Sequence, residues 1–197
     1  MIKIISDNLL EYLIKSNVID DSEDCIAYYR YGLEITISSI LNIVLILLVG
    51  IISNNFFESI AFLICFIPLR QFTGGYHADT YFKCNLSFVV LFSLLLLIYN
   101  ITFKFISIYA EITMLVFSLV IFITECPIEN KNKPLTDKQK RKNGCLAVIL
   151  GFLYGATGVI LKVLSYSIGV IFIYTLVLIS ILIIVAALQK IRKGEEQ

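Results

Sequence analysis

The sequence predicts an all-α fold: a polytopic membrane helix bundle with six hydrophobic segments, one of them short, and an N-terminal amphipathic helix. Apolar residues make up 58% of the 197 residues, more than the roughly 45–50% that is usual in soluble domains. They gather in long blocks that short polar stretches separate. This pattern is typical of helices that satisfy their own backbone hydrogen bonds in lipid. Membrane lipid is therefore an expected partner, and nucleic acid is not.

The N-terminal stretch has the pattern of an amphipathic helix over residues 2–18. One side carries apolar side chains and the other carries charged ones, and no apolar core with a small-residue cleavage site is present. The apolar side is formed by Ile2, Ile5, Leu9 and Leu13, and the charged side by Lys3, Asp7, Glu11 and Lys15. Such a helix lies at the membrane surface or packs on the ends of the bundle, and both alternatives stay open.

Six apolar blocks follow. They are Leu33–Ile52, Phe56–Leu69, Asn85–Phe103, Phe105–Thr124, Gly144–Leu161 and Ser167–Leu188. The second block is the short one, because about 14 residues of helix span roughly 21 Å of a hydrocarbon core of about 30 Å. The chain is thus divided into an N-terminal region (1–30), a transmembrane domain (31–188) and a tail (189–197).

Lysine and arginine are concentrated in alternate connections. The 125–143 connection and the tail are basic, whereas the opposite set of connections holds only Lys104 and Lys162. Because basic connections stay inside the cell, both termini, the 70–84 segment and the 125–143 loop are predicted to be cytoplasmic. The expected location is the bacterial inner, or cytoplasmic, membrane.

Polar residues also occur within the first apolar block. Glu34, Ser38 and Asn42 recur every four residues and therefore share one helix face. A polar stripe in a membrane helix normally faces the interior of the bundle, and an ionisable group there is a candidate for function.

Small residues form a second periodic pattern, in the fifth block. Ala147, Gly151 and Gly155 follow a small-xxx-small spacing, which allows another helix to approach closely. The partner helix belongs either to the same subunit or to a second copy in a homodimer.

The 70–84 segment carries the reactive side chains. It reads RQFTGGYHADTYFKC and contains the chain's single histidine, His77, and Cys84. An imidazole within hydrogen-bond reach can hold a thiol as the nucleophilic thiolate. On one straight helix the two side chains would be about 10.5 Å apart, too far for that contact. The chain must therefore bend between them if they form a dyad, and coincidence is the alternative.

Neighbouring residues suit the same chemistry. Gly74 and Gly75 offer backbone freedom and N–H groups for an oxyanion hole. Arg70 and Lys83 would raise the local positive potential and favour a thiolate. The remaining cysteines, in mid-block or at block ends, are interpreted as packing or incidental residues. Because the spacings match no usual ligand pattern, neither a metal site nor a cofactor is predicted.

The whole pattern resembles a known family. The spacing R-x-x-x-G-G-Y-H-A-D-x-Y-x-x-C over 70–84, and the later stretch CPIENKNKPL over 126–135, are similar to the AgrB (accessory gene regulator B) family. Members are membrane cysteine endopeptidases that cleave the C-terminal part of a precursor peptide, AgrD. An acyl-thioester intermediate then leads to a cyclic autoinducing peptide for quorum sensing. The resemblance implies that His77 and Cys84 are the catalytic pair and that 31–188 is the peptidase domain.

Supporting roles remain open. Asp79 or Glu34 would orient His77, and for Glu34 an ion pair with Arg70 or Arg30 is the alternative. The basic 125–143 loop either only sets the topology or binds an acidic precursor tail through Lys131 and Lys133. Two other functions compete with the peptidase: a small transporter or exporter of a peptide without proteolysis, and a membrane scaffold held by the glycine ladder.

Overall fold

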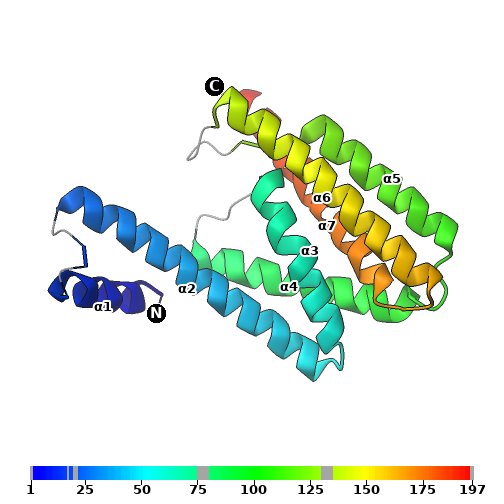
Figure 1. Cartoon of the computed structure of the whole chain (residues 1–197), viewed down its shortest axis with the longest axis horizontal. Helices are drawn as coiled ribbons and strands as arrows, with labels where there is room; N and C mark the ends of the chain where they lie inside the picture. The colour runs from blue at the N-terminus through cyan, green and yellow to red at the C-terminus, as the bar shows by residue number, and fades with distance from the viewer. Residues whose placement is uncertain (1, 17, 20–21, 75–79, 130–134, 196–197) are drawn as a thin grey trace.

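The chain folds into helices throughout, as a computed structural model describes it over residues 2–16, 18–19, 22–74, 80–129 and 135–195. Seven helices lie in these described ranges (Figure 1): α1 (Ile2–Lys15), α2 (Glu23–Ile52), α3 (Phe56–Thr73), α4 (Tyr81–Thr102), α5 (Ile108–Glu125), α6 (Asp137–Val163) and α7 (Gly169–Glu195). Helices α2 to α7 are long and apolar enough to cross a membrane. The all-α prediction with six spans is confirmed, and the chain is a multi-pass membrane protein.

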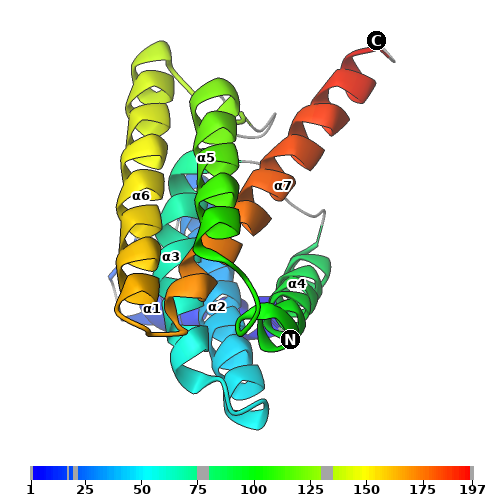
Figure 2. The same cartoon turned by 90° about the vertical axis from the view of Figure 1, so that its right-hand side faces the viewer.

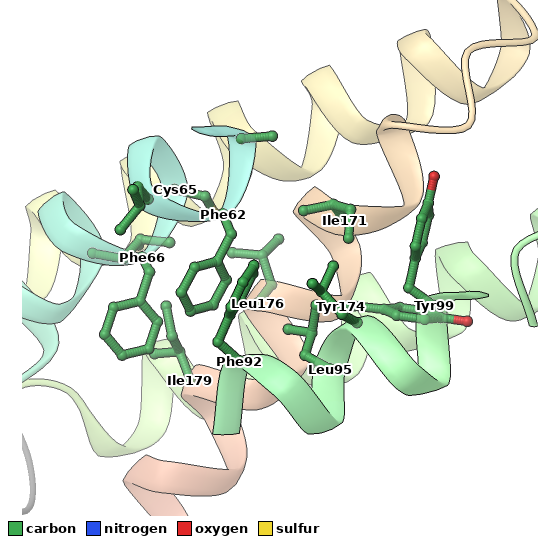
Figure 3. Packing of buried hydrophobic residues seen from close by; sticks show 14 of the residues in the cluster. Phe62, Cys65, Phe66, Phe92, Leu95, Tyr99, Ile171, Tyr174, Leu176 and Ile179 are labelled. Carbon is green, nitrogen blue, oxygen red and sulfur yellow. The ribbon is translucent and has the colours of Figure 1, made fainter. Parts of the chain in front are cut away.

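Helices α3 and α7 occupy the centre of the bundle. Helix α7 packs against α3, α5 and α6, while α2 packs against α1, α3 and α4 (Figure 2). The core forms where α3, α4 and α7 meet, with Phe62, Phe92 and Leu176 fully buried (Figure 3). The Phe62 and Phe92 ring centroids are 4.7 Å apart.

The two ends of the bundle differ in their connections. At one end, here called the site end, lie the α3–α4 and α5–α6 connections. The other end, here called the hairpin end, has three shorter connections. There Lys162 lies 3.4 Å from the fully buried Glu111 carboxylate and donates a hydrogen bond to the Phe103 carbonyl oxygen.

Several helices are longer than the apolar blocks predict. Helix α2 begins at Glu23 rather than Leu33, because the residues between them include no proline and the helix accommodates Gly32. Helix α3 runs on from Leu69 to Thr73 and so has 18 residues. Helix α6 begins at Asp137 rather than Gly144, since Thr136 and Gln139 form a capping box there. Hydrophobicity marked the part of each helix that suits lipid, not the whole helix.

Helix α1 packs along the first half of α2. Its Ser6 and Leu10 are buried there, and Arg30 of α2 pairs with Asp7 at 3.0 Å. On the predicted apolar side, Ile5 and Leu9 are exposed, and Ile2 and Leu13 are half-buried. The helix therefore contacts the bundle and still presents an apolar face, so the proposed interfacial position of residues 1–30 stays a prediction.

The small-residue ladder of α6 packs inside this one chain. Ala147, Gly151 and Gly155 are all buried. A Cβ added at Gly151 would lie 2.7 Å from the Phe122 ring of α5, and one at Gly155 would collide with Leu115. The ladder thus lets α6 approach α5, and of the two alternatives the structure supports the contact within one subunit.

Candidate functional site at the N-terminus of α4

The helix break that the dyad requires is present before Cys84. Thr80 is extended (φ −137°, ψ 146°), and its hydroxyl accepts a hydrogen bond from the Lys83 amide that caps α4. Because α4 begins only at Tyr81, no single helix joins residues 77 and 84. His77, Gly75 and Asp79 lie outside the described residues, so the dyad itself stays a prediction.

Cys84 lies in the first turn of α4 and is partly buried. Its backbone amide donates to the Thr80 carbonyl oxygen at 3.0 Å, which fixes the start of the turn. The positive end of the helix dipole is located here. The thiol is also within electrostatic range of Arg70, which comes from the last turn of α3.

Arg70 and Gly74 together end α3. An Arg70 guanidinium nitrogen donates to the Gly74 carbonyl oxygen. Gly74 has φ +67°, a conformation that favours glycine, and a Cβ there would collide with the Ile128 carbonyl oxygen. The structure therefore gives Gly74 a backbone role, and the predicted oxyanion-hole role remains untested.

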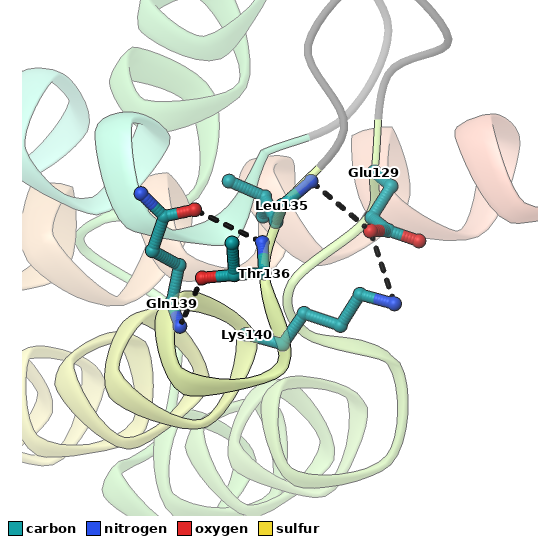
Figure 4. Close-up of polar contacts among 5 residues, drawn as sticks. All are labelled: Glu129, Leu135, Thr136, Gln139 and Lys140. Carbon is teal, nitrogen blue, oxygen red and sulfur yellow. Dashed lines mark hydrogen bonds and ion pairs between the residues drawn. The ribbon is translucent and has the colours of Figure 1, made fainter.

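The chain after α5 joins this site. The Ile128 amide donates to the Thr73 carbonyl oxygen at 3.0 Å, and Ile128 forms a parallel bridge with Gly74. Glu129 then accepts hydrogen bonds from Lys140 at 3.1 Å and from the Leu135 amide at 3.3 Å (Figure 4). These contacts fasten both ends of the α5–α6 loop beside α3. Lys131 and Lys133, the predicted substrate contacts, lie outside the described residues.

A second thiol, Cys126, also lies within electrostatic range of Arg70. Burial, and next the Glu125 carboxylate, raise the pKa of the Cys126 thiol to about 12, although the Arg70 charge acts in the opposite direction. Cys126 is therefore a neutral thiol at physiological pH, which makes it a poor nucleophile.

The polar stripe of α2 faces the first turns of α4, as predicted for a bundle interior. Glu34 neighbours the Tyr81 phenol. One and two turns further on, Ser38 and Asn42 both donate to the Asn85 side-chain oxygen, at 2.8 and 3.0 Å. The predicted alternative partner Arg30 instead pairs with Asp7.

Sequence reasoning missed two of these residues. Tyr81 and Asn85 lie one turn apart on α4, on either side of Cys84 in sequence, and both contact the α2 stripe. The sequence did contain a signal for Asn85. A polar side chain is unusual in a membrane helix and needs a hydrogen-bond partner, and this one lies next to a candidate nucleophile. Within the described residues, no group of three or more histidine, cysteine or acidic side chains could hold a metal ion.

Comparisons with known proteins agree with this architecture. The family described as accessory gene regulator B (AgrB) matches residues 6–190. A protein of Clostridium perfringens strain SM101 named AgrB-like is 26% identical over 175 residues, which cover 85% of this chain and 78% of that protein. One of Clostridium beijerinckii, also named AgrB-like, is 28% identical over 145 residues, or 72% and 70% of the two chains. No solved structure gives a significant match. Since the family match covers nearly the whole chain, this membrane protein belongs to the accessory gene regulator B family.

Proposed function

We propose that this protein is an integral-membrane cysteine endopeptidase that cleaves the C-terminal part of an AgrD-like precursor and promotes cyclisation to an autoinducing peptide. Family membership supports the precursor and the product. The single observation that carries the chemistry is the position of Cys84, in the first turn of α4 beside Arg70 and directly after a helix break. The Arg70 charge and the start of α4 favour a thiolate, while the partial burial of the thiol opposes it more strongly, so the proposal relies on His77 to take the proton.

The proposed first step forms an acyl-enzyme. The Cys84 thiolate attacks the carbonyl carbon of the scissile peptide bond and forms a C–S bond. His77, protonated when it took the thiol proton, returns that proton to the leaving amine as the C–N bond breaks. The amine departs with the precursor's C-terminal fragment, and the N-terminal part stays on Cys84 as a thioester.

The second step closes the ring. A cysteine thiol of the bound precursor, or a serine hydroxyl in other substrates, attacks the thioester carbon, and its proton passes to His77 while the Cys84 thiolate leaves. Exchange between thiols suits a cysteine enzyme, because the entering and leaving groups have similar basicity. The product thiolactone is more reactive than the amide that was broken. Removal of the cleaved fragment or of the ring must therefore drive the reaction forward.

Other groups receive supporting roles in this proposal. Arg70 holds positive charge beside the sulfur, and Gly75 with Gly74 would offer N–H groups to the oxyanion. Glu34 or Asp79 would orient His77, while Lys131 and Lys133 would attract an acidic precursor tail. Glu34→Gln with unchanged cleavage would remove Glu34 from this list. In the proposed topology the site end faces the cytoplasm, where the precursor is made.

The test is co-expression of the chain with a candidate precursor peptide encoded nearby. Cleavage should be lost in both Cys84→Ser and His77→Ala, with normal membrane insertion. Cys145→Ser is the matched control, since Cys145 is an exposed cysteine on α6, and it should cleave normally. Persistent cleavage in Cys84→Ser would falsify the proposal. Transfer of uncleaved peptide across the membrane would instead favour a transporter.

A further inference from the structure

A buried polar contact joins α2 to α4 one residue beyond the proposed nucleophile. The Asn85 side-chain oxygen accepts two hydrogen bonds from α2, one from the Ser38 hydroxyl and one from the Asn42 amide. Asn85 is 6% exposed and Ser38 is 7% exposed. Two donors, one helical turn apart, thus converge on a single acceptor.

Stability alone does not explain this arrangement. Hydrogen bonds between membrane helices are worth only about 0.6 kcal/mol on average. The Asn42 side-chain oxygen is buried without a hydrogen-bond partner, which carries a cost that apolar side chains would avoid. The contact instead fixes the orientation of α4: it sets the rotation of α4 about its own axis and the position of α4 along α2.

The rotation of α4 also determines where the Cys84 side chain lies. Tyr81 and Asn85 lie on the same face of α4, and both meet the α2 stripe. Cys84 lies between them in sequence and is displaced around the helix by about 100° from Asn85. When the Asn85 face is held against α2, the Cys84 side chain lies within range of Arg70 on α3. A rotation of α4 would change that separation.

We propose that Asn85, held by Ser38 and Asn42, is a positioning residue that keeps the Cys84 sulfur within electrostatic range of the Arg70 guanidinium. The catalytic significance of this contact rests on the proposed function, in which Cys84 is the nucleophile. The positioning itself does not, because it can be read from the chemical reactivity of the thiol without any substrate.

The experiment measures alkylation of each cysteine against pH in the full-length protein in lipid nanodiscs, with the modified peptides resolved by mass spectrometry. In Ser38→Ala and Asn85→Leu, Cys84 should react about threefold more slowly at neutral pH, the scale of one lost hydrogen bond between membrane helices. Its pH profile should move to higher pH, because the thiolate loses the Arg70 charge. Cys25 and Cys145 serve as internal references and should be unchanged.

Two matched variants make the test specific. Ser39→Ala changes the neighbouring serine of α2, which is exposed, and should leave the Cys84 profile as in the wild type. Ser38→Thr keeps the hydroxyl and should restore most of the rate. With a cleavable precursor, kcat should fall in Ser38→Ala by a similar factor while KM stays the same.

Three outcomes would overturn the inference. One is an unshifted Cys84 profile in both Ser38→Ala and Asn85→Leu. Another is an equal change in Cys25 and Cys145, which would indicate general loosening. The third is an effect of Ser39→Ala as large as that of Ser38→Ala. Cleavage that persists in Cys84→Ser would refute the proposed function instead, and the alkylation profile would still decide whether Asn85 positions the thiol.

Discussion

The contacts of α6 and the contact of α2 with α4 join long membrane helices by opposite means. Small residues bring α6 close to α5 and α7, so that Gly151 meets the Phe122 ring and Gly158 meets the backbone of α7. Between α2 and α4, at the site end, the contact is made by an amide, a hydroxyl and a second amide. Packing of small residues gives rigidity, whereas the polar contact specifies one rotation of a helix. The polar contact lies next to Cys84, whose proposed role as a nucleophile requires a defined side-chain orientation.

The largest expected effect on stability comes from a large side chain in the small-residue contact between α6 and α7. A Cβ at Gly158 would lie 2.9 Å from the Gly169 carbonyl oxygen, a backbone atom that cannot move aside. Gly158→Leu should therefore cost about 3 kcal/mol or more of folding free energy. The measure is the yield and thermal midpoint of purified protein. Gly32→Leu is the control, since nothing lies within 4 Å of a Cβ at Gly32; equal losses in the two variants would contradict the prediction.

The two thiols near Arg70 should differ in reactivity. With its pKa at about 12, the Cys126 thiol stays neutral below that pH. At pH 8 it should be alkylated at least a hundredfold more slowly than a thiol of ordinary pKa, which is about 8.5. The exposed Cys145 is the reference within the same molecule. Comparable rates for Cys126 and Cys145 would show that the Cys126 thiol is not held neutral.

A smaller effect is expected at the hairpin end. Lys162→Met would leave the Glu111 carboxylate, which is 0% exposed, without its ion-pair partner. Because Lys162 is itself partly exposed, the expected loss is roughly 2 kcal/mol, below the range for fully buried pairs. Glu111→Gln combined with Lys162→Met should recover most of the thermal midpoint. Failure of the double variant to recover would mean that Lys162 acts through the Phe103 carbonyl instead.

The smallest effect is expected where α1 meets α2. The Arg30 and Asp7 side chains are 45% and 41% exposed, so solvent screens their 3.0 Å ion pair. A double-mutant cycle with Arg30→Gln and Asp7→Asn should give a coupling of about 0.5 kcal/mol or less. A coupling above about 1 kcal/mol would instead show that this ion pair contributes substantially to the packing of α1 against α2.

The sequence by itself determined the helical class, the six spans and the inward face of the α2 stripe. The reason is that lipid requires each apolar segment to close its own hydrogen bonds, and a four-residue spacing fixes which side chains share a face. If His77 and Cys84 act as a dyad, the sequence also requires a break between them, and the extended Thr80 provides one. Hydrophobicity alone placed two helix starts too late, at Leu33 and Gly144: a capping box sets the start of α6 at Asp137, whereas α2 begins at Glu23 without a side-chain cap.

Only the tertiary structure decided the partners. Nothing in the spacing of Gly151 and Gly155 distinguishes a contact with α5 from one between subunits, because both need the same small residues. Ser38 and Asn85 are far apart in the sequence, so their pairing follows from how α2 and α4 cross rather than from any local pattern. The same holds for the bridge between Ile128 and Gly74 and for the second thiol near Arg70. Local sequence determines where the helices form, and the packing of the helices against one another determines which residues surround Cys84.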